Sequence, residues 1–429
     1  MSRRHRLTSA GLDRLAAGPG EAADLALLRR GQLSRRLIMI EGVVRRAEPG
    51  LGLRAAAGVL AETRRGSPAS AERSLLHPCL GTWAARSLAA MAPGGPPERV
   101  PADPGYLAAL AAAAVLSSDA VVRHRPLRLE PMGGAVVLPG LGRLHSPGPH
   151  CGLATLDHGR LLLAGRRSAP GWQAVRRFRY ATAGLRIDLA LEDLDPYRDD
   201  YVWPVSPRLS ATEAERWRAA LARAWSLLAA DHRLYAEAMG RVLAAVVPLK
   251  AGPAGSLAAT SPRTFGAVAL AFVDDPVELA ALLVHEVQHM KLAALLDLVP
   301  LHTGAGDALH RVPWRPDPRP VEGVLQGTYA HLGLSDFWAA RCVRGKGPGA
   351  HRARERFALH HAHAVTGSLI LRAADELTPA GRRFAGTMAE ALRLNRRHAV
   401  LQAPATTALP ARAERKAADA GAPTCFRKP

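Results

Sequence analysis

The stretch that decides this fold is residues 276–298, with the sequence PVELAALLVHEVQHMKLAALLDL. Apolar residues occur on almost every face of this stretch, Pro276 suits the first turn of a helix, and Asp274 and Asp275 are candidates for the N-cap. Pro300 ends the pattern. We therefore expect a single buried helix over about 276–298, because a helix that is apolar all round belongs in a core.

This helix carries His285-Glu286-Val287-Gln288-His289, an HExxH pentapeptide. Residues four apart leave the same face of a helix, so the two imidazoles can bind one metal ion. Glu286 lies close enough to contact a metal-bound water or the metal itself. The alternative is a pair of core histidines that bond to backbone carbonyls. Because buried polar side chains cost free energy without partners, we prefer a metal bound by His285 and His289, with Glu286 catalytic.

A metal on these histidines needs a further protein ligand or a coordinating substrate. Residues 321–338 are predicted to form a helix, and Glu322 on its first turn is our candidate for the third ligand. Gln326 lies one turn further on the same face, whereas His331 projects roughly opposite to Glu322. The remaining alternatives are the other histidines of this half of the chain: His302, His310, His360, His361 and His363.

Between these two helices lies the proline-rich segment 312–320, VPWRPDPRP. Four prolines in nine residues forbid a helix and stiffen the backbone. Arg315 and Arg319 are thereby held on a rigid loop, which suits bidentate recognition of a carboxylate. The alternative is a structural loop whose arginines pair with surface carboxylates. We assign both arginines to the candidate catalytic and cofactor-binding residues.

The fold class expected is α+β and mostly helical, with a zincin-like HExxH helix beside a small sheet. Residues 266–273 are predicted to form a buried strand that leads directly into that helix. In zincin-like folds, an edge strand beside this helix can pair with an extended peptide. A strand at this place is therefore compatible with peptide chemistry.

The pattern of apolar and turn residues divides the chain into four regions. We expect a helical N-terminal region over 1–125, a small β-rich subdomain over 126–200, an HExxH metal-binding catalytic domain over 201–400 and a disordered tail over 401–429. The length of 429 residues and the hydrophobic content of 48% leave room for these parts and their cores.

The formal net charge of +20 would ordinarily indicate an anionic partner. Here the positive charge is almost entirely arginine and is spread along the chain without a long basic run. Abundant arginine and alanine with little lysine is typical of a GC-rich genome. We therefore expect no nucleic-acid partner, while an acidic peptide substrate remains open.

The cysteines stand far apart and form no CxxC pair: Cys79, Cys151, Cys342 and Cys425. This argues against a cysteine zinc site, an iron–sulfur cluster and a disulfide framework, and favours the reducing cytoplasm. The basic N-terminus is not followed by an apolar run, and no segment is apolar for long enough to suggest a membrane span.

Several segments together resemble the actinobacterial HExxH-motif peptide-modification proteins. The resemblance is good over about 190–340 and loose in the N-terminal half. It rests on these segments: LVHEVQHMKL at 283–292, LLDL at 295–298, PWR at 313–315, DPRP at 317–320, GVLQGTYA at 323–330, DLDPYR at 193–198 and VPL at 247–249.

The resemblance implies a 2-oxoglutarate-dependent β-hydroxylase that modifies side chains of a ribosomally made precursor peptide, encoded beside radical-SAM maturases. The metal would then be Fe(II), with His285 and His289 as ligands and Glu286 in or next to its coordination sphere. Arg315 and Arg319 match the family's DPRP segment, and we expect one of them to hold the distal carboxylate of 2-oxoglutarate.

Two other functions remain open on the sequence. The same motif serves a zinc metallopeptidase that cleaves a peptide or leader, with Glu286 as general base. Alternatively, the chain is a non-catalytic peptide-binding partner of a maturase with a degenerate site. Imidazole and carboxylate ligands suit both iron and zinc, so ligand type does not choose between the metals.

Overall fold

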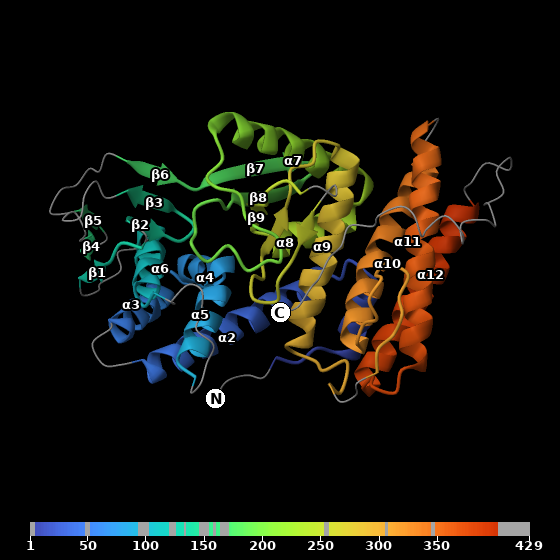
Figure 1. Ribbon diagram of the computed structural model, residues 1–429, viewed down its shortest axis with the longest axis horizontal. Coiled ribbons are helices and arrows are strands. Elements are labelled where there is room, and N and C mark those ends of the chain that lie inside the picture. Colours follow the sequence, from blue (N-terminus) through green and yellow to red (C-terminus); the bar gives the residue numbers. More distant parts are fainter. Residues whose placement is uncertain are drawn as a thin grey trace.

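The computed structural model describes residues 5–47, 52–92, 103–119, 126–132, 134–145, 154–157, 160–163, 171–252, 257–304, 308–344 and 348–401. The described chain is α+β and predominantly helical, as expected. Figure 1 shows an elongated molecule with small sheets at one end, a larger sheet in the middle and a group of long helices at the other end. The expected disordered tail falls almost wholly outside the described residues.

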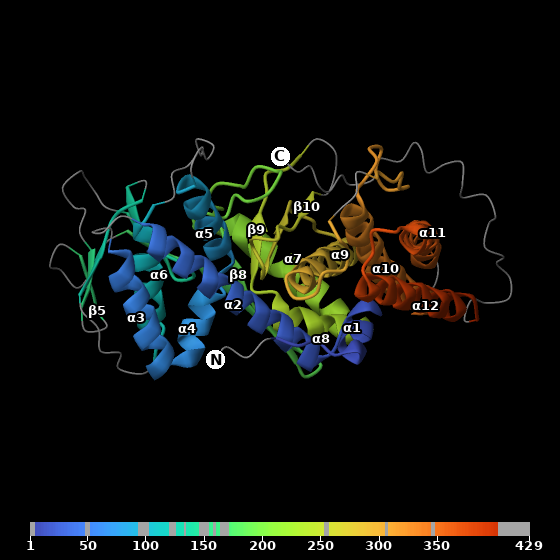
Figure 2. The ribbon, with the colours of Figure 1, turned by 90° about the horizontal axis from the view of Figure 1, so that it is seen from below.

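The N-terminal part is helical. Its described helices are α1 (Ser9–Ala16), α2 (Ala22–Arg46), α3 (Leu53–Gly66), α4 (Pro68–Leu75), α5 (Pro78–Ala90) and α6 (Gly105–Leu116). Seen from below in Figure 2, α2 runs from α1, which packs on α12 (Pro379–Leu401), toward α3 and α5.

Two small antiparallel sheets follow the N-terminal helices. One has the order β1-β4-β5, from Leu127–Leu129, Ala154–Asp157 and Arg160–Leu163. The other has the order β2-β3-β6, from Ala135–Leu138, Gly142–His145 and Trp172–Ala174.

The central sheet has five strands in the order β10-β11-β9-β8-β7. Its strands are β7 (Arg176–Thr182), β8 (Leu185–Leu191), β9 (Ala245–Pro248), β10 (Ala258–Ala259) and β11 (Ala267–Leu270). β7 and β8 form an antiparallel hairpin, whereas β8, β9 and β11 run parallel to one another. The strand that leads into the HExxH helix is therefore interior to the sheet, and the short β10 forms the edge.

The C-terminal half supplies the long helices. They are α7 (Ala211–Asp231), α8 (Arg233–Val242), α9 (Pro276–Leu296), α10 (Val321–Arg344), α11 (Pro348–Ala373) and α12. Figure 1 shows α9 between the central sheet and the group formed by α10, α11 and α12. α9 contacts α7 and β11 on one side and α10 on the other, so it is enclosed.

The hydrophobic cores do not follow the region boundaries expected from the sequence. Leu25 and Leu28 of α2 belong to the core built around α9, whereas Ile40 and Val43 of the same helix belong to the core with α3, α5 and α6. β7 and β8, expected in a separate β-rich subdomain over 126–200, pair with β9 in the central sheet. Long-range strand pairing, which composition does not encode, joins these regions.

Within the described residues, α9 is the helix with the length and apolarity to span a membrane. However, 78% of its most apolar 18-residue window is buried inside the protein. The core helix of a globular protein has this same environment, so the apolar stretch is accounted for by its place in the fold.

Candidate metal centre

The HExxH helix forms as the sequence predicts. α9 begins at Pro276, and the side chain of Asp275 accepts hydrogen bonds from the backbone N–H groups of Val277 and Glu278. The N–H groups in the first turn of a helix have no backbone acceptor within the helix, and this N-cap provides an acceptor for two of them. The helix continues through both histidines without a break and ends at Leu296. The motif therefore lies on rigid backbone in the interior.

The two imidazoles of the motif face one another. Nε2 of His289 lies 3.1 Å from Nε2 of His285. Two nitrogen ligands of one tetrahedral ion, each about 2.0–2.1 Å from it, are separated by about 3.3 Å. The observed separation is thus close to that of two ligands of one metal.

Gln326 of α10 orients one of these rings. Its Oε1 lies 3.0 Å from Nδ1 of His289, and because an amide oxygen only accepts, Nδ1 carries the proton. Nε2 of His289 is left with its lone pair directed at His285. Metal-binding histidines are typically fixed in this way by a hydrogen bond at the other ring nitrogen.

A second group of histidines lies beside the motif. His331 of α10 packs with its ring centroid 5.8 Å from that of His285. Its Nδ1 lies 3.1 Å from Nδ1 of His360 on α11, and its ring is 4.8 Å from that of His363. Ligand atoms of His331, His360 and His363 all lie within 4.8 Å of one another. Three neighbouring helices thus bring five imidazoles together.

These imidazoles are held neutral, which is the form that binds metals. Burial lowers the pKa of His289 to about 4, of His363 to about 4 and of His360 to about 3. The pKa values of His285 and His331 are lowered well below the ordinary range, chiefly by burial and then by neighbouring histidines. A divalent cation at this place would meet lone pairs and little competing positive charge.

Two ring nitrogens in this cluster have no hydrogen-bond partner among the residues that the structure describes. They are Nδ1 of His285 and Nδ1 of His363, and both atoms are buried. Buried nitrogen atoms without partners are costly, and a ligand at Nδ1 of His363 would relieve one of them, whereas a metal on Nε2 of His285 leaves Nδ1 of that ring unchanged. The donor set, which is rich in imidazole, fits a divalent transition metal such as iron or zinc.

The carboxylates predicted for this site lie on two different elements. Glu286 is completely buried. Tyr201 lies in the loop that follows β8, and its pKa is raised mainly by burial. The charge of Glu286 adds to this effect, so the carboxylate lies within electrostatic range of the Tyr201 hydroxyl. Glu322 is partly exposed on the first turn of α10, one turn before Gln326.

The third ligand chosen from the sequence was Glu322, but the imidazole that packs against His285 belongs to His331. Sequence spacing on α10 placed His331 on the opposite side of that helix from Glu322. It did not show that α9 and α11 both pack on α10 and enclose that side. The sequence feature that could have indicated this arrangement is the cluster of histidines at 360–363, because His360 and His363 group with His331.

The other histidines considered from the sequence lie elsewhere. His302 pairs with Leu377 in an isolated β-bridge, and His310 pairs with Arg319 in another. His361 lies on α11 with its Nδ1 3.1 Å from the hydroxyl of Ser335. Of the alternatives named for the third ligand, the structure therefore groups His331, His360 and His363 with the motif.

The proline-rich loop packs directly on this cluster. Trp314 lies with its ring centroid 5.1 Å from that of His331 and 6.1 Å from that of His363. The indole fits between two glycines: a Cβ on Gly327 would lie 2.5 Å from the ring, and a Cβ on Gly367 would lie 2.8 Å from it. Glycine at both positions allows Trp314 to cover the seam between α10 and α11.

Arg315 and Arg319 flank one carboxylate on this loop. Nε of Arg315 lies 3.3 Å from Asp317, and Nη1 of Arg319 lies 2.7 Å from the other oxygen of the same side chain. Both guanidinium groups are largely covered, whereas Asp317 is half exposed. Two arginines of the loop that carries Trp314 thus converge on one half-exposed carboxylate.

Comparison with known proteins gives no assignment: no protein-family profile matches the chain, and no curated protein matches it significantly. The geometry of the site and the sequence resemblance are therefore the grounds for assigning a function.

Proposed function

We propose that this protein is a metal-dependent enzyme that modifies a ribosomally made precursor peptide, by hydroxylation that requires Fe(II) and 2-oxoglutarate. The observation that carries the proposal is the pair of Nε2 atoms of His285 and His289, 3.1 Å apart on one buried helix. Without metal this contact is a hydrogen bond in which Nε2 of His285 donates to Nε2 of His289, and a metal ion would replace that proton. Two facing ring nitrogens beside three more neutral imidazoles support a transition-metal centre.

In this proposal His285 and His289 hold the iron, and Gln326 fixes the tautomer of His289. His331 is the preferred third protein ligand because its ring packs against that of His285. Glu322 remains the alternative if the third ligand is a carboxylate. Bound iron(II) supplies oxidation by O₂ with 2-oxoglutarate as co-substrate. The chain supplies positioning: three helices fix the ligands, and the covering Trp314 excludes water from the side of His331 and His363.

Arg315 and Arg319 are the proposed anchor for the distal carboxylate of 2-oxoglutarate. Both guanidinium groups pair with half-exposed Asp317, which is the contact expected of a structural loop, so the carboxylate of 2-oxoglutarate would have to replace or join Asp317. Arginine presents paired donors that match a carboxylate in geometry, which lysine does not. We expect Arg315→Lys or Arg319→Lys to raise the KM for 2-oxoglutarate while metal content is unchanged.

The preference for oxidation over hydrolysis rests on the sequence resemblance, and the burial of Glu286 is compatible with it. In a zinc peptidase this carboxylate must contact the water that attacks the peptide bond. Glu286 is completely enclosed, whereas His285 keeps partial exposure. Within the motif, His285 is therefore the residue that retains some exposure, and Glu286 lies in the protein interior.

Mass spectrometry of a co-expressed precursor peptide tests the proposal. The expected product carries one added oxygen atom on a side chain and forms in vitro only with iron(II), 2-oxoglutarate and O₂. Cleaved peptide that forms with zinc and without 2-oxoglutarate would replace the proposal by a metallopeptidase. Unchanged peptide from fully metal-loaded protein would favour a non-catalytic partner of a maturase.

A further inference from the structure

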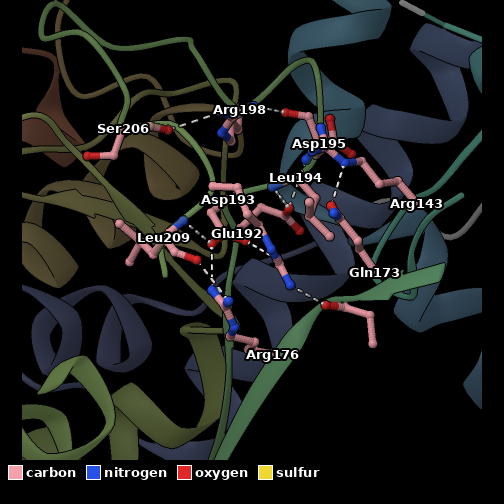
Figure 3. A network of polar contacts seen from close by, with 12 residues as sticks. Arg143, Gln173, Arg176, Glu192, Asp193, Leu194, Asp195, Arg198, Ser206 and Leu209 are labelled. Atoms are coloured by element: carbon pink, nitrogen blue, oxygen red, sulfur yellow. Dashed lines mark hydrogen bonds and ion pairs between the residues drawn. The ribbon is translucent and has the colours of Figure 1, made fainter. Parts of the chain in front are cut away.

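A second buried polar cluster lies far from the histidine centre in sequence, where α5 meets the turn after β8. His77 is the N-cap of α5, and Cys79 lies on its first turn. Glu192 and Asp195 lie on the turn that follows β8, and Figure 3 shows this turn with its hydrogen bonds. Tyr106 of α6 completes the cluster, and all five residues are buried.

The three potential metal ligands of this cluster come within bonding range of one ion. One ligand atom each from His77, Cys79 and Asp195 lies within 4.8 Å of the others. Nδ1 of His77 lies 3.8 Å from Oδ2 of Asp195. Nδ1 of His77 is buried and has no hydrogen-bond partner among the described residues. An unpartnered nitrogen thus points to the place where a thiol and a carboxylate oxygen converge.

Glu192 stands behind His77 in the way that carboxylates support metal-binding histidines. Oε1 of Glu192 accepts hydrogen bonds from the backbone N–H groups of Leu194 and Asp195, so the side chain is fixed. Its other oxygen, Oε2, lies 3.4 Å from Nε2 of His77. A proton on Nε2 that faces this carboxylate leaves the lone pair on Nδ1, which is the arrangement of a carboxylate–histidine–metal triad.

Asp195 is oriented in the same manner. Its Oδ1 accepts from the backbone N–H of Tyr197, and its Oδ2 accepts from the hydroxyl of Tyr106 at 2.8 Å. The turn itself is anchored through Asp193, which Arg176 contacts at 3.0 Å and Arg208 also contacts (Figure 3). The backbone between Glu192 and Asp195 is therefore rigid before any ligand binds.

Burial at this cluster penalises negative charge unless a cation is present. Burial raises the pKa of the Cys79 thiol well above its usual range, and the charges of Asp195 and Glu192 raise it further. Only 1% of Cys79 is exposed, which excludes a role as a nucleophile toward an external substrate. A divalent cation would reverse this balance, because it favours the thiolate and both carboxylates together.

We propose that Nδ1 of His77, Sγ of Cys79 and Oδ2 of Asp195 bind a zinc-class divalent metal ion, with Glu192 as the carboxylate that orients His77. The sequence argued against a cysteine zinc site because no CxxC pair is present, whereas this site takes a single cysteine. Mixed nitrogen, sulfur and oxygen ligands suit zinc, and a water molecule would complete four-coordination. The competing arrangement without metal is an ion pair between protonated His77 and Glu192.

The consequence of this second site is structural. It joins the start of α5, in the N-terminal helical core, to the turn that leaves the central sheet. Tyr201 lies within electrostatic range of both Cys79 and Glu286. The two centres share no ligand, and this proposal is independent of the proposed function.

Cobalt(II) substitution tests the proposal, because a cobalt–thiolate bond gives a near-ultraviolet charge-transfer band that imidazole and carboxylate ligands do not give. The protein is stripped of metal and titrated with cobalt(II). We expect the band by two equivalents in the unsubstituted protein, which has two proposed centres, and by one equivalent in a variant that lacks His285 and His289. Absence of the band in the unsubstituted protein would overturn the proposal.

The source of the thiolate is decided by two complementary variants. Cys79→Ser is expected to abolish the band. Because that buried substitution can disturb folding, the second variant replaces Cys151, Cys342 and Cys425 together by serine and leaves Cys79 as the sole thiol. The band must survive in this variant. Its loss there would assign the thiolate to another cysteine and refute the site at Cys79.

Discussion

The Nε2 atoms of His285 and His289 lie 3.1 Å apart on successive turns of α9, and the far nitrogen of His289 is held by Gln326 of α10. The helix sets the spacing of the two rings, and the neighbouring helix sets the tautomer of one. The two imidazoles are therefore preorganised to bind one metal ion in the metal-free protein.

His285→Ala is expected to abolish high-affinity metal binding at the histidine centre, because one of two converging lone pairs is removed. The matched control is His351→Ala, since His351 is exposed on α11. Metal analysis of reconstituted proteins measures the difference as a loss of one ion per chain, because the second proposed site would keep its ion. Full metal content in the His285 variant would remove the basis of the proposed function.

His331→Ala and Glu322→Ala decide the third ligand. We expect the larger loss of metal affinity in the His331 variant, because its ring is the one that packs against His285. Titration with a competing chelator measures both affinities. A loss confined to the Glu322 variant would instead establish the carboxylate as the ligand.

Gln326→Ala is expected to weaken metal binding by roughly 10–100-fold, the usual effect of removing a group that orients a histidine ligand. Gln326→Glu keeps an acceptor for the Nδ1 proton of His289 and should retain most of the affinity. Equal losses in the two variants would show that the hydrogen bond is not what matters at this position.

The metal-free protein is expected to lose stability as pH falls from 6.5 to about 4. Burial lowers the pKa of His289 to about 4 in the folded chain, whereas the unfolded chain keeps the ordinary value of 6.5. The unfolded state then binds more protons in this interval, so the contribution to stability is complete above pH 6.5 and declines below it.

The magnitude is up to about 1.4 kcal/mol per pH unit for one such group. Urea unfolding at several pH values in the presence of chelator measures the free energy of unfolding. His363→Phe removes one titrating imidazole whose pKa is lowered to about 4, and it should reduce the slope. An unchanged slope would indicate that this ring is accessible to protons in the folded chain.

Gly327→Ala is expected to destabilise the fold by about 1–3 kcal/mol, because the added Cβ would lie 2.5 Å from the ring of Trp314. Gly386→Ala is the control, since this exposed position on α12 has no atom within 4 Å of an added Cβ. There we expect a gain of about 0.5–1 kcal/mol from helix propensity. Thermal and urea unfolding compare the two.

Local signals in the sequence were sufficient for the elements around the site. Asp275 and Pro276 start α9 as expected, and α10 forms over the region 321–338 predicted to be helical. Caps, prolines and apolar periodicity act within a few residues, so they can be read from the chain directly.

The grouping of side chains from distant elements could not be read in this way. His331 joins His285 only because α10 packs on α9, and His77 meets Asp195 only because α5 packs beside the turn after β8. Neither of these contacts can be predicted from the spacing of residues in the sequence. Each depends on which apolar faces pack together and on the orientation of the packed elements.

The sequence by itself determined that two histidines project from one turn of a buried helix, since helical periodicity fixes side-chain direction over four residues. Tertiary structure alone decided which imidazoles surround that pair and which tautomer His289 adopts. It also decided that β7 and β8 belong to the central sheet. These outcomes depend on packing between segments far apart in the chain, where the free energy of burying whole faces outweighs any local preference.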